Sequence, residues 1–374
     1  MIAAVTAATH ASFALVAYEA ALRLGAPHPA VVAAALAAAS FAAFFERARA
    51  MMPDRQRPRW QVHLVEEPFF AHWCAALATA AVVLPAAVLV PLVEVALGRS
   101  PALPTSFALG AYAVSLAFAA WGVFVRRRWV EVREIDVVIP NLPEGFEGYR
   151  VVHLSDLHIG GHTPRAWAEG WARRSNREAP DLVAVTGDLV TSGTEFHADI
   201  ASVVGMLEAK DGVLVSLGNH DYFGEGEPLI AKLRAVGARV LRNEGHHVER
   251  DGDRVYFAGV DDTWTRRANV RQALHAREPG VIAIVLAHDP ALFAEALLHG
   301  VALVLAGHTH GGQIALPFLA HRVSLAQLTH RHWLGLYREG EGSMYVHGGL
   351  GTTGPPIRLG VAPEIAVLTL RCAP

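Results

Sequence analysis

Residue types that bind divalent metal ions follow five apolar runs between residues 149 and 306 of this sequence. After the run 212–216, an amide, an imidazole and a carboxylate occur in a row at Asn219, His220 and Asp221. Next to a buried strand each of these groups needs its own polar partner. The other four groups are Asp156 with His158, Asp188, His288, and His308 with His310. Carboxylate, imidazole and amide oxygens suit hard or borderline divalent ions, so the five groups indicate a metal site.

The apolar runs that precede these groups are typical of buried strands. They cover residues 149–155, 180–186, 212–216, 280–287 and 301–306, and further strands are predicted near 129–138, 239–241 and 255–260. Helical segments are predicted around Trp167 and Trp171 and at 196–209 and 227–236. Alternating strands and helices predict an α/β domain, and ligands in such sheets bind beyond the carboxyl ends of the strands. The five polar groups are therefore expected to converge.

The order of these groups resembles the calcineurin-like metallophosphoesterase family. Its pattern of Asp-x-His, Gly-Asp, Gly-Asn-His-Asp, His and Gly-His-x-His is complete here between residues 148 and 370. The resemblance implies an α/β fold, a two-sheet αββα sandwich, and two divalent ions of manganese, iron or zinc. It implies that Asp156, His158 and His310 hold one metal, that Asn219, His288 and His308 hold the other, and that Asp188 bridges them.

The implied reaction is hydrolysis of a phosphate ester. Two cations lower the pKa of a water molecule that bridges them, and the resulting hydroxide attacks phosphorus. Two residues are predicted to be catalytic: His220 gives a proton to the leaving oxygen, and Asp221 orients its ring and raises its pKa. Substrate binding is assigned to Asn219, His220 and Arg358.

A nearer resemblance is to the membrane-associated bacterial branch of the family. It rests on the segments 155–158, 243–244, 259–262, 308–313 and 349–358. Some relatives in that branch hydrolyse UDP-2,3-diacylglucosamine, so the expected substrate is a phosphodiester or pyrophosphate, with a lipid-linked molecule among the candidates. The alternative is a non-enzymatic metal-binding membrane scaffold or sensor with the same fold, which would need no proton donor.

The composition divides the chain into two parts. Hydrophobic residues make up 52% and charged residues 18% of it, and residues 1–125 hold only six of the 35 acidic groups. The remainder has a mild acidic balance, which argues against a nucleic-acid surface. We therefore predict a transmembrane region at 1–128, a linker with a first strand at 129–147, and a catalytic domain at 148–374.

Four apolar stretches, 2–22, 30–45, 69–97 and 107–125, predict about four transmembrane helices in contact with membrane lipid. A buried soluble bundle is the alternative, but the stretches have little polar face. Arginines cluster at 47, 49, 55, 57 and 59 and at 126–128, whereas the other two loops have one each. The positive-inside rule then predicts a multi-pass protein of the inner (cytoplasmic) membrane with its catalytic domain on the cytoplasmic side.

Overall fold

The computed structural model describes residues 2–50, 53–98, 106–315 and 322–373. The chain forms two compact units, which are described separately. The first consists of Met1–Met51, Pro58–Arg126 and Pro355–Ile357. The second consists of Met52–Arg57, Arg127–Gly354 and Arg358–Pro374. Residues 53–57 thus belong to the second unit, although the segments before and after them in sequence belong to the first.

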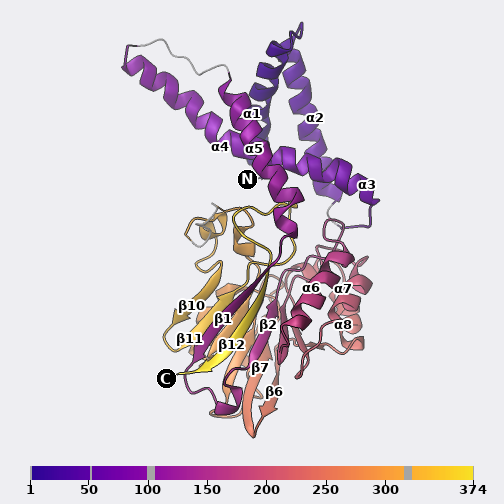
Figure 1. Ribbon diagram of the computed structural model, residues 1–374, viewed down its shortest axis with the longest axis vertical. Helices are drawn as coiled ribbons and strands as arrows, with labels where there is room; N and C mark the ends of the chain where they lie inside the picture. Colours follow the sequence, from indigo (N-terminus) through magenta and orange to yellow (C-terminus); the bar gives the residue numbers. More distant parts are fainter. Residues whose placement is uncertain (1, 51–52, 99–105, 316–321, 374) are drawn as a thin grey trace. The chain divides into compact units, whose positions relative to one another are not determined.

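The first unit is helical (Figure 1). Its elements are α1 (Ile2–Arg23), α2 (Pro29–Ala50), α3 (Arg59–Gln61), η1 (Val62–Glu66), α4 (Glu67–Ala96) and α5 (Phe107–Phe124). Among the described residues, three helices are long and apolar enough to cross a membrane, at Pro29–Arg49, Arg59–Ala96 and Phe107–Arg128. Three of the roughly four predicted spans are thus found among the described residues, and α1 is not among the three. Thr6, Thr9 and Ser12 give α1 a polar buried side.

A chain of hydrogen bonds links four helices of this unit. The Ser40 hydroxyl on α2 lies 3.2 Å from Nε2 of His10 on α1 and 2.8 Å from Nε2 of His72 on α4. Nδ1 of His72 lies 2.8 Å from the Tyr112 hydroxyl on α5. Polar side chains between apolar helices hold them together, because the alternative is an unsatisfied polar group in apolar surroundings.

Two mixed sheets form the second unit, and within the described residues each has six strands. The first has the order β1 (Glu131–Ile139), β12 (Glu364–Cys372), β2 (Arg150–Leu154), β3 (Leu182–Thr186), β4 (Val213–Ser216) and β5 (Arg239–Val240). The second has the order β10 (Gly335–Glu339), β11 (Gly342–Val346), β9 (Leu303–Ala306), β8 (Ile282–Leu286), β7 (Asp253–Gly259) and β6 (Glu244–Arg250). Parallel pairing runs from β2 to β5 and from β7 through β8 and β9 to β11.

Helices cover the outer faces of both sheets. On the first sheet they are α6 (Arg165–Arg177), α7 (His197–Val204) and α8 (Gly226–Ala235), and on the second α9 (Val270–Ala273) and α10 (Phe293–Leu298). Short helical turns are η2 (Arg126–Arg128), η3 (Glu144–Phe146), η4 (His220–Tyr222), η5 (Pro290–Leu292), η6 (His310–Gly312) and η7 (Leu325–Leu328). The predicted two-sheet αββα sandwich is confirmed.

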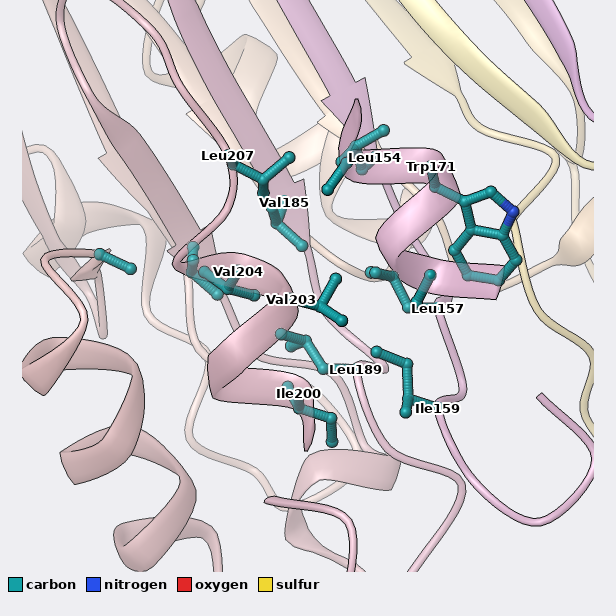
Figure 2. Packing of buried hydrophobic residues seen from close by; sticks show 14 of the residues in the cluster. Leu154, Leu157, Ile159, Trp171, Val185, Leu189, Ile200, Val203, Val204 and Leu207 are labelled. Carbon is teal, nitrogen blue, oxygen red and sulfur yellow. The ribbon is translucent and has the colours of Figure 1, made fainter. Parts of the chain in front are cut away.

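Three apolar layers hold the sandwich together. Figure 2 shows one of them, where Trp171 of α6 and Ile200 and Val203 of α7 pack on Leu154 and Val185 of the first sheet. A second layer lies between the sheets, and a third lies under α9 and α10. Burial of one such side chain stabilises a fold by about 1.5–3 kcal/mol. The strands are thereby fixed, and so are the loops at their ends.

Candidate metal centre

Loops at the carboxyl ends of five strands supply the polar groups of the centre. The first sheet contributes Asp156 and His158 after β2, Asp188 after β3, and Asn219 and His220 after β4. The second sheet contributes His288 after β8, and His308 and His310 after β9. All except His220 and His308 are almost completely buried. The structure thus brings together both halves of the predicted set.

Five of these residues have a left-handed backbone. They are Asp156 (φ 53°), His158 (φ 43°), Asp188 (φ 52°), His308 (φ 70°) and His310 (φ 51°). Non-glycine residues rarely adopt this conformation, which costs of order 1–3 kcal/mol each and persists where the surroundings enforce it. The chain turns sharply at these residues after the strands end, and the turns bring the side chains together.

Glycines make this close approach possible. Gly187 has φ 79°, and a Cβ there would meet the Gly218 amide and the His288 ring. A Cβ at Gly307 would meet Ser155 and the Asp156 carboxylate. The glycines of the Gly-Asp and Gly-His motifs therefore have a steric reason to lack a side chain.

Potential ligand atoms form three groups among the described residues, and one of them, His158, Asp188 and His220, shares a residue with each of the other two. Asp156, His158 and His310 form one group, and Asp188, His288 and His308 form another, each with its ligand atoms within 4.8 Å of one another. Oδ2 of Asp188 lies 3.6 Å from Nε2 of His158 and 3.2 Å from Nε2 of His288. Asp188 therefore lies next to a histidine of each group, which is the position of a bridging carboxylate.

Ring nitrogens face one another within the centre. Nε2 of His158 lies 3.1 Å from Nε2 of His310, and Nε2 of His288 lies 3.2 Å from Nδ1 of His308. Two such nitrogens share at most one proton between them. Lone pairs that converge in this way suit a cation, so the donor set fits two divalent ions.

Contacts behind the ligands fix their orientation. Nδ1 of His288 lies 2.7 Å from the Thr186 carbonyl, which turns Nε2 towards Asp188. The His308 amide donates to both carboxylate oxygens of Asp156 at 3.1 Å. The Oδ1 atom of Asn219 is buried and has no hydrogen-bond partner among the described residues. An unsatisfied buried oxygen is costly, and a metal ion at this place would satisfy it.

Burial determines the charge of most of these groups. It raises the pKa of Asp156 to about 6, and it lowers the pKa of His158 to about 3 and that of His308 to about 4. Burial also disfavours the charged form of His288, but the Asp188 and Asp156 carboxylates outweigh it and raise its pKa to about 10. Neutral imidazoles keep the lone pairs that a metal requires.

His220 lies at the edge of the centre and is only partly buried. Its Nδ1 atom lies 2.6 Å from the Thr191 carbonyl, and its ring meets that of His158 edge to face at a centroid distance of 4.7 Å. Its amide donates to Oδ1 of Asp188 at 2.9 Å. The carbonyl of Thr191 requires a proton on Nδ1, so Nε2 of a neutral His220 is the acceptor.

The prediction that Asp221 orients the His220 ring is wrong in its geometry. The Asp221 carboxylate instead accepts backbone hydrogen bonds from Asp188 and Gly218, both at 2.9 Å. It also accepts them from Leu189 at 2.8 Å and Val190 at 3.3 Å. Burial raises the pKa of Asp221 to about 7. The residue binds two ligand loops together, and Thr191 is the group that orients His220.

The prediction that Arg358 contacts substrate is also wrong. Its side chain is completely buried, and its guanidinium donates to the carbonyls of Gly351 at 2.6 Å and Gly348 at 2.7 Å. One of its nitrogens lies 3.3 Å from Nδ1 of His310. Arg358 therefore holds the loop after β11 against the centre.

The Thr191 carbonyl, which orients His220, could not be predicted from the sequence, because every residue has a backbone carbonyl and residue type does not distinguish this one.

The chain is similar to known proteins across this unit. A family model described as calcineurin-like phosphoesterase matches residues 149–312. The metallophosphoesterase YkuE of Bacillus subtilis is 28% identical over 252 residues, which cover 66% of this chain and 88% of that protein. The metallophosphoesterase YkoQ of the same organism is 30% identical over 225 residues, which cover 58% of this chain and 81% of that protein.

One vertebrate relative is named as a transmembrane protein. The transmembrane protein with metallophosphoesterase domain of Danio rerio is 30% identical over 274 residues. The match covers 70% of this chain and 62% of that protein, so the chain spans about three fifths of the relative's length.

Proposed function

Because the chain belongs to the calcineurin-like metallophosphoesterase family, we propose that it is a membrane-integrated phosphoesterase that hydrolyses a phosphodiester or pyrophosphate bond with two divalent metal ions. The observation that carries this proposal is the position of Asp188 between His158 and His288. One carboxylate shared by two groups of ligands is the arrangement that a two-metal hydrolase needs.

The ligands divide into two sets in this proposal. Asp156, His158 and His310 would hold one ion, Asn219, His288 and His308 would hold the other, and Asp188 would contact both. When bound, the ions would supply a water nucleophile near neutral pH and would neutralise charge on the phosphoryl group. Manganese, iron and zinc all suit this donor set.

His220 has the role of proton donor to the leaving oxygen. The Thr191 carbonyl holds the proton on Nδ1, so Nε2 of the doubly protonated ring would be the atom that releases a proton to the leaving oxygen. Together with the Asn219 amide, His220 would also bind the phosphoryl group. Asp221 contributes through the backbone, because its carboxylate fixes the amides of Asp188 and Leu189.

The second unit is placed on the cytoplasmic side of the inner membrane in this proposal. Two features support it: the arginines at 47–59 and 126–128, and the membership of Met52–Arg57 and Arg127–Gly354 in the same unit. Two candidate spans, Arg59–Ala96 and Phe107–Arg128, separate these segments. An even number of crossings puts both segments on one side.

The test is hydrolysis by full-length protein in detergent, loaded in turn with manganese, iron and zinc. Substrates are bis-p-nitrophenyl phosphate, p-nitrophenyl phosphate, a cyclic nucleotide and UDP-2,3-diacylglucosamine, with products identified by mass. We expect metal-dependent cleavage of the diester or the pyrophosphate. Cleavage of the lipid nucleotide would support a lipid-linked substrate, and inertness towards it would remove that substrate class alone.

Matched variants separate an enzyme from a scaffold. Asp188→Ala should abolish turnover, whereas His275→Ala, a change outside the centre, should leave it unchanged. If the wild-type protein binds two ions per chain and hydrolyses none of these esters, the metal-binding scaffold replaces the enzyme as the best account.

A further inference from the structure

Residues 53–57, between α2 and α3 in sequence, pack on the loops that follow two of the predicted metal ligands. These loops are residues 159–162, after His158, and 191–195, after Asp188. The Gln56 amide donates to the Glu195 carboxylate at 3.1 Å. All of these residues belong to the second unit.

Asp54 is the centre of this contact. It is only 3% exposed, and its carboxylate accepts the Gly161 amide at 2.9 Å and the Arg57 guanidinium at 2.9 Å. Its own amide donates to the Ser192 hydroxyl at 2.9 Å. The Asp54 carboxylate thus contacts the loop after His158, and the Asp54 backbone amide contacts the loop after Asp188.

The loops have no room for side chains where the 53–57 segment lies. A Cβ at Gly160 would overlap the Asp54 carboxylate, and a Cβ at Gly161 would overlap the Arg57 guanidinium. Gly193 has φ 74° and faces Pro53. Residues 159–162 are also held from another side, because Arg127 donates to the His162 carbonyl at 3.0 Å.

Docking of residues 53–57 on these loops would not by itself require a buried carboxylate. Burial raises the pKa of the Asp54 carboxyl, so its position has an electrostatic cost that its hydrogen bonds must offset. Leucine or alanine in a docked loop would avoid that cost. The hydrogen bonds therefore point to a requirement for the exact position of the loops.

The loop that Asp54 holds is the one that orients His220. Ser192, which accepts from the Asp54 amide, directly follows Thr191, whose carbonyl lies 2.6 Å from Nδ1 of His220. The Thr191 hydroxyl donates to the His158 carbonyl at 3.3 Å. A shift of residues 191–192 would move the acceptor away from the imidazole. A misplacement of about 1 Å can cost 10²-fold in rate.

We propose that Asp54 is a positioning residue for His220, acting through Ser192 and Thr191, and that residues 53–57 are therefore a structural part of the active site. This inference rests on the proposed role of His220 as proton donor.

The kinetic test uses two full-length variants, because Asp54 makes two kinds of contact. Asp54→Ala removes the carboxylate that binds Gly161 and Arg57, and Ser192→Ala removes the hydroxyl that accepts the Asp54 amide and should lower kcat in the same way. Asp54→Asn is the conservative variant and Arg55→Ala is the control. Arg55 lies in the same segment, but its side chain is exposed. We expect kcat for the diester to fall about 10- to 100-fold in Asp54→Ala, with KM and the number of bound ions unchanged. Asp54→Asn keeps an oxygen for the Gly161 amide and should retain more activity, and Arg55→Ala should match the wild type.

A double variant identifies the route of the effect. In a His220→Ala background, Asp54→Ala should lower kcat by less than about two-fold, because the group that it positions is already absent. An undiminished loss in that background would overturn the proposal and would leave Asp54 a general stabiliser of the fold.

Hydrogen exchange measures the same contact without turnover. In Asp54→Ala the amides of residues 159–162 and 190–193 should exchange faster than in the wild type, with core strand β3 unchanged. Unchanged exchange in both loops would contradict the proposal. If the wild-type protein hydrolyses no ester, the proposed function fails by that result alone, and the exchange data still decide whether Asp54 holds these loops.

Discussion

The buried carboxylate of Asp221 allows a direct choice between two roles. An orienting role towards His220 predicts that Asp221→Ala lowers kcat and leaves stability unchanged. The structure instead predicts that Asp221→Ala lowers the stability of the fold. The carboxylate accepts hydrogen bonds from four backbone amides of two ligand loops. The loss of this one side chain leaves all four donors without their partner.

The expected size of the effect follows from those donors. An unsatisfied buried donor costs about 1–3 kcal/mol. The four share one carboxylate and their costs do not add in full, so we expect a loss of about 3–5 kcal/mol in the free energy of unfolding. For a domain of this size each kcal/mol shifts Tm by about 2–4 °C, so Tm should fall by about 10 °C.

The assay is thermal unfolding of full-length protein in detergent, with bound metal counted on the same samples. Glu225→Ala is the control, because Glu225 is an exposed carboxylate near Asp221 in sequence, and it should change stability by less than about 0.5 kcal/mol. Asp221→Ala with an unchanged Tm and a lower kcat would refute the structural reasoning and restore the orienting role.

Three further predictions concern stability. Arg358→Ala should lower Tm by several degrees because buried carbonyls lose their donor, while Arg338→Ala, at an exposed position, should not; equal Tm values for the two variants would contradict this. Burial lowers the pKa of His347 to about 3 and that of His153 well below its usual value, so both contribute stability that is complete above pH 6.5 and falls as the pH drops, by up to about 1.4 kcal/mol per pH unit each. Denaturant unfolding measured between pH 7 and 5 should show that the unfolding free energy falls less steeply with decreasing pH in His347→Asn than in the wild type. Equal pH dependence in the two proteins would refute the lowered pKa of His347. Ser40→Ala should weaken the helical unit by about 1 kcal/mol in detergent denaturation, and an unchanged midpoint would mean that its hydrogen bonds add nothing.

The ligand cluster could be predicted because its signal is local. Each metal-type residue follows an apolar strand, and strand ends on one edge of a sheet meet in space. Asp188 and His288 therefore converge although 100 positions separate them. The left-handed backbone at Asp156 and Asp188 shows the strain that accompanies such convergence, and residue types alone do not reveal it.

The errors arose where partners are distant or lack side chains. Asp221 is next to His220 in sequence, yet its partners are amides after β3. Arg358 lies in a polar, glycine-rich segment, but carbonyl groups of that segment enclose it. Asp54 lies over 100 positions from Gly161, and one aspartate among arginines gives no sign of a buried contact.

The most direct test of the two-metal centre is the rate of bis-p-nitrophenyl phosphate hydrolysis as metal-free full-length protein is titrated with manganese and bound ions are counted. We expect the rate to rise to a plateau at two bound ions per chain, and Asp188→Ala to show no such rise. A plateau at one ion, or two bound ions with no hydrolysis, would contradict it.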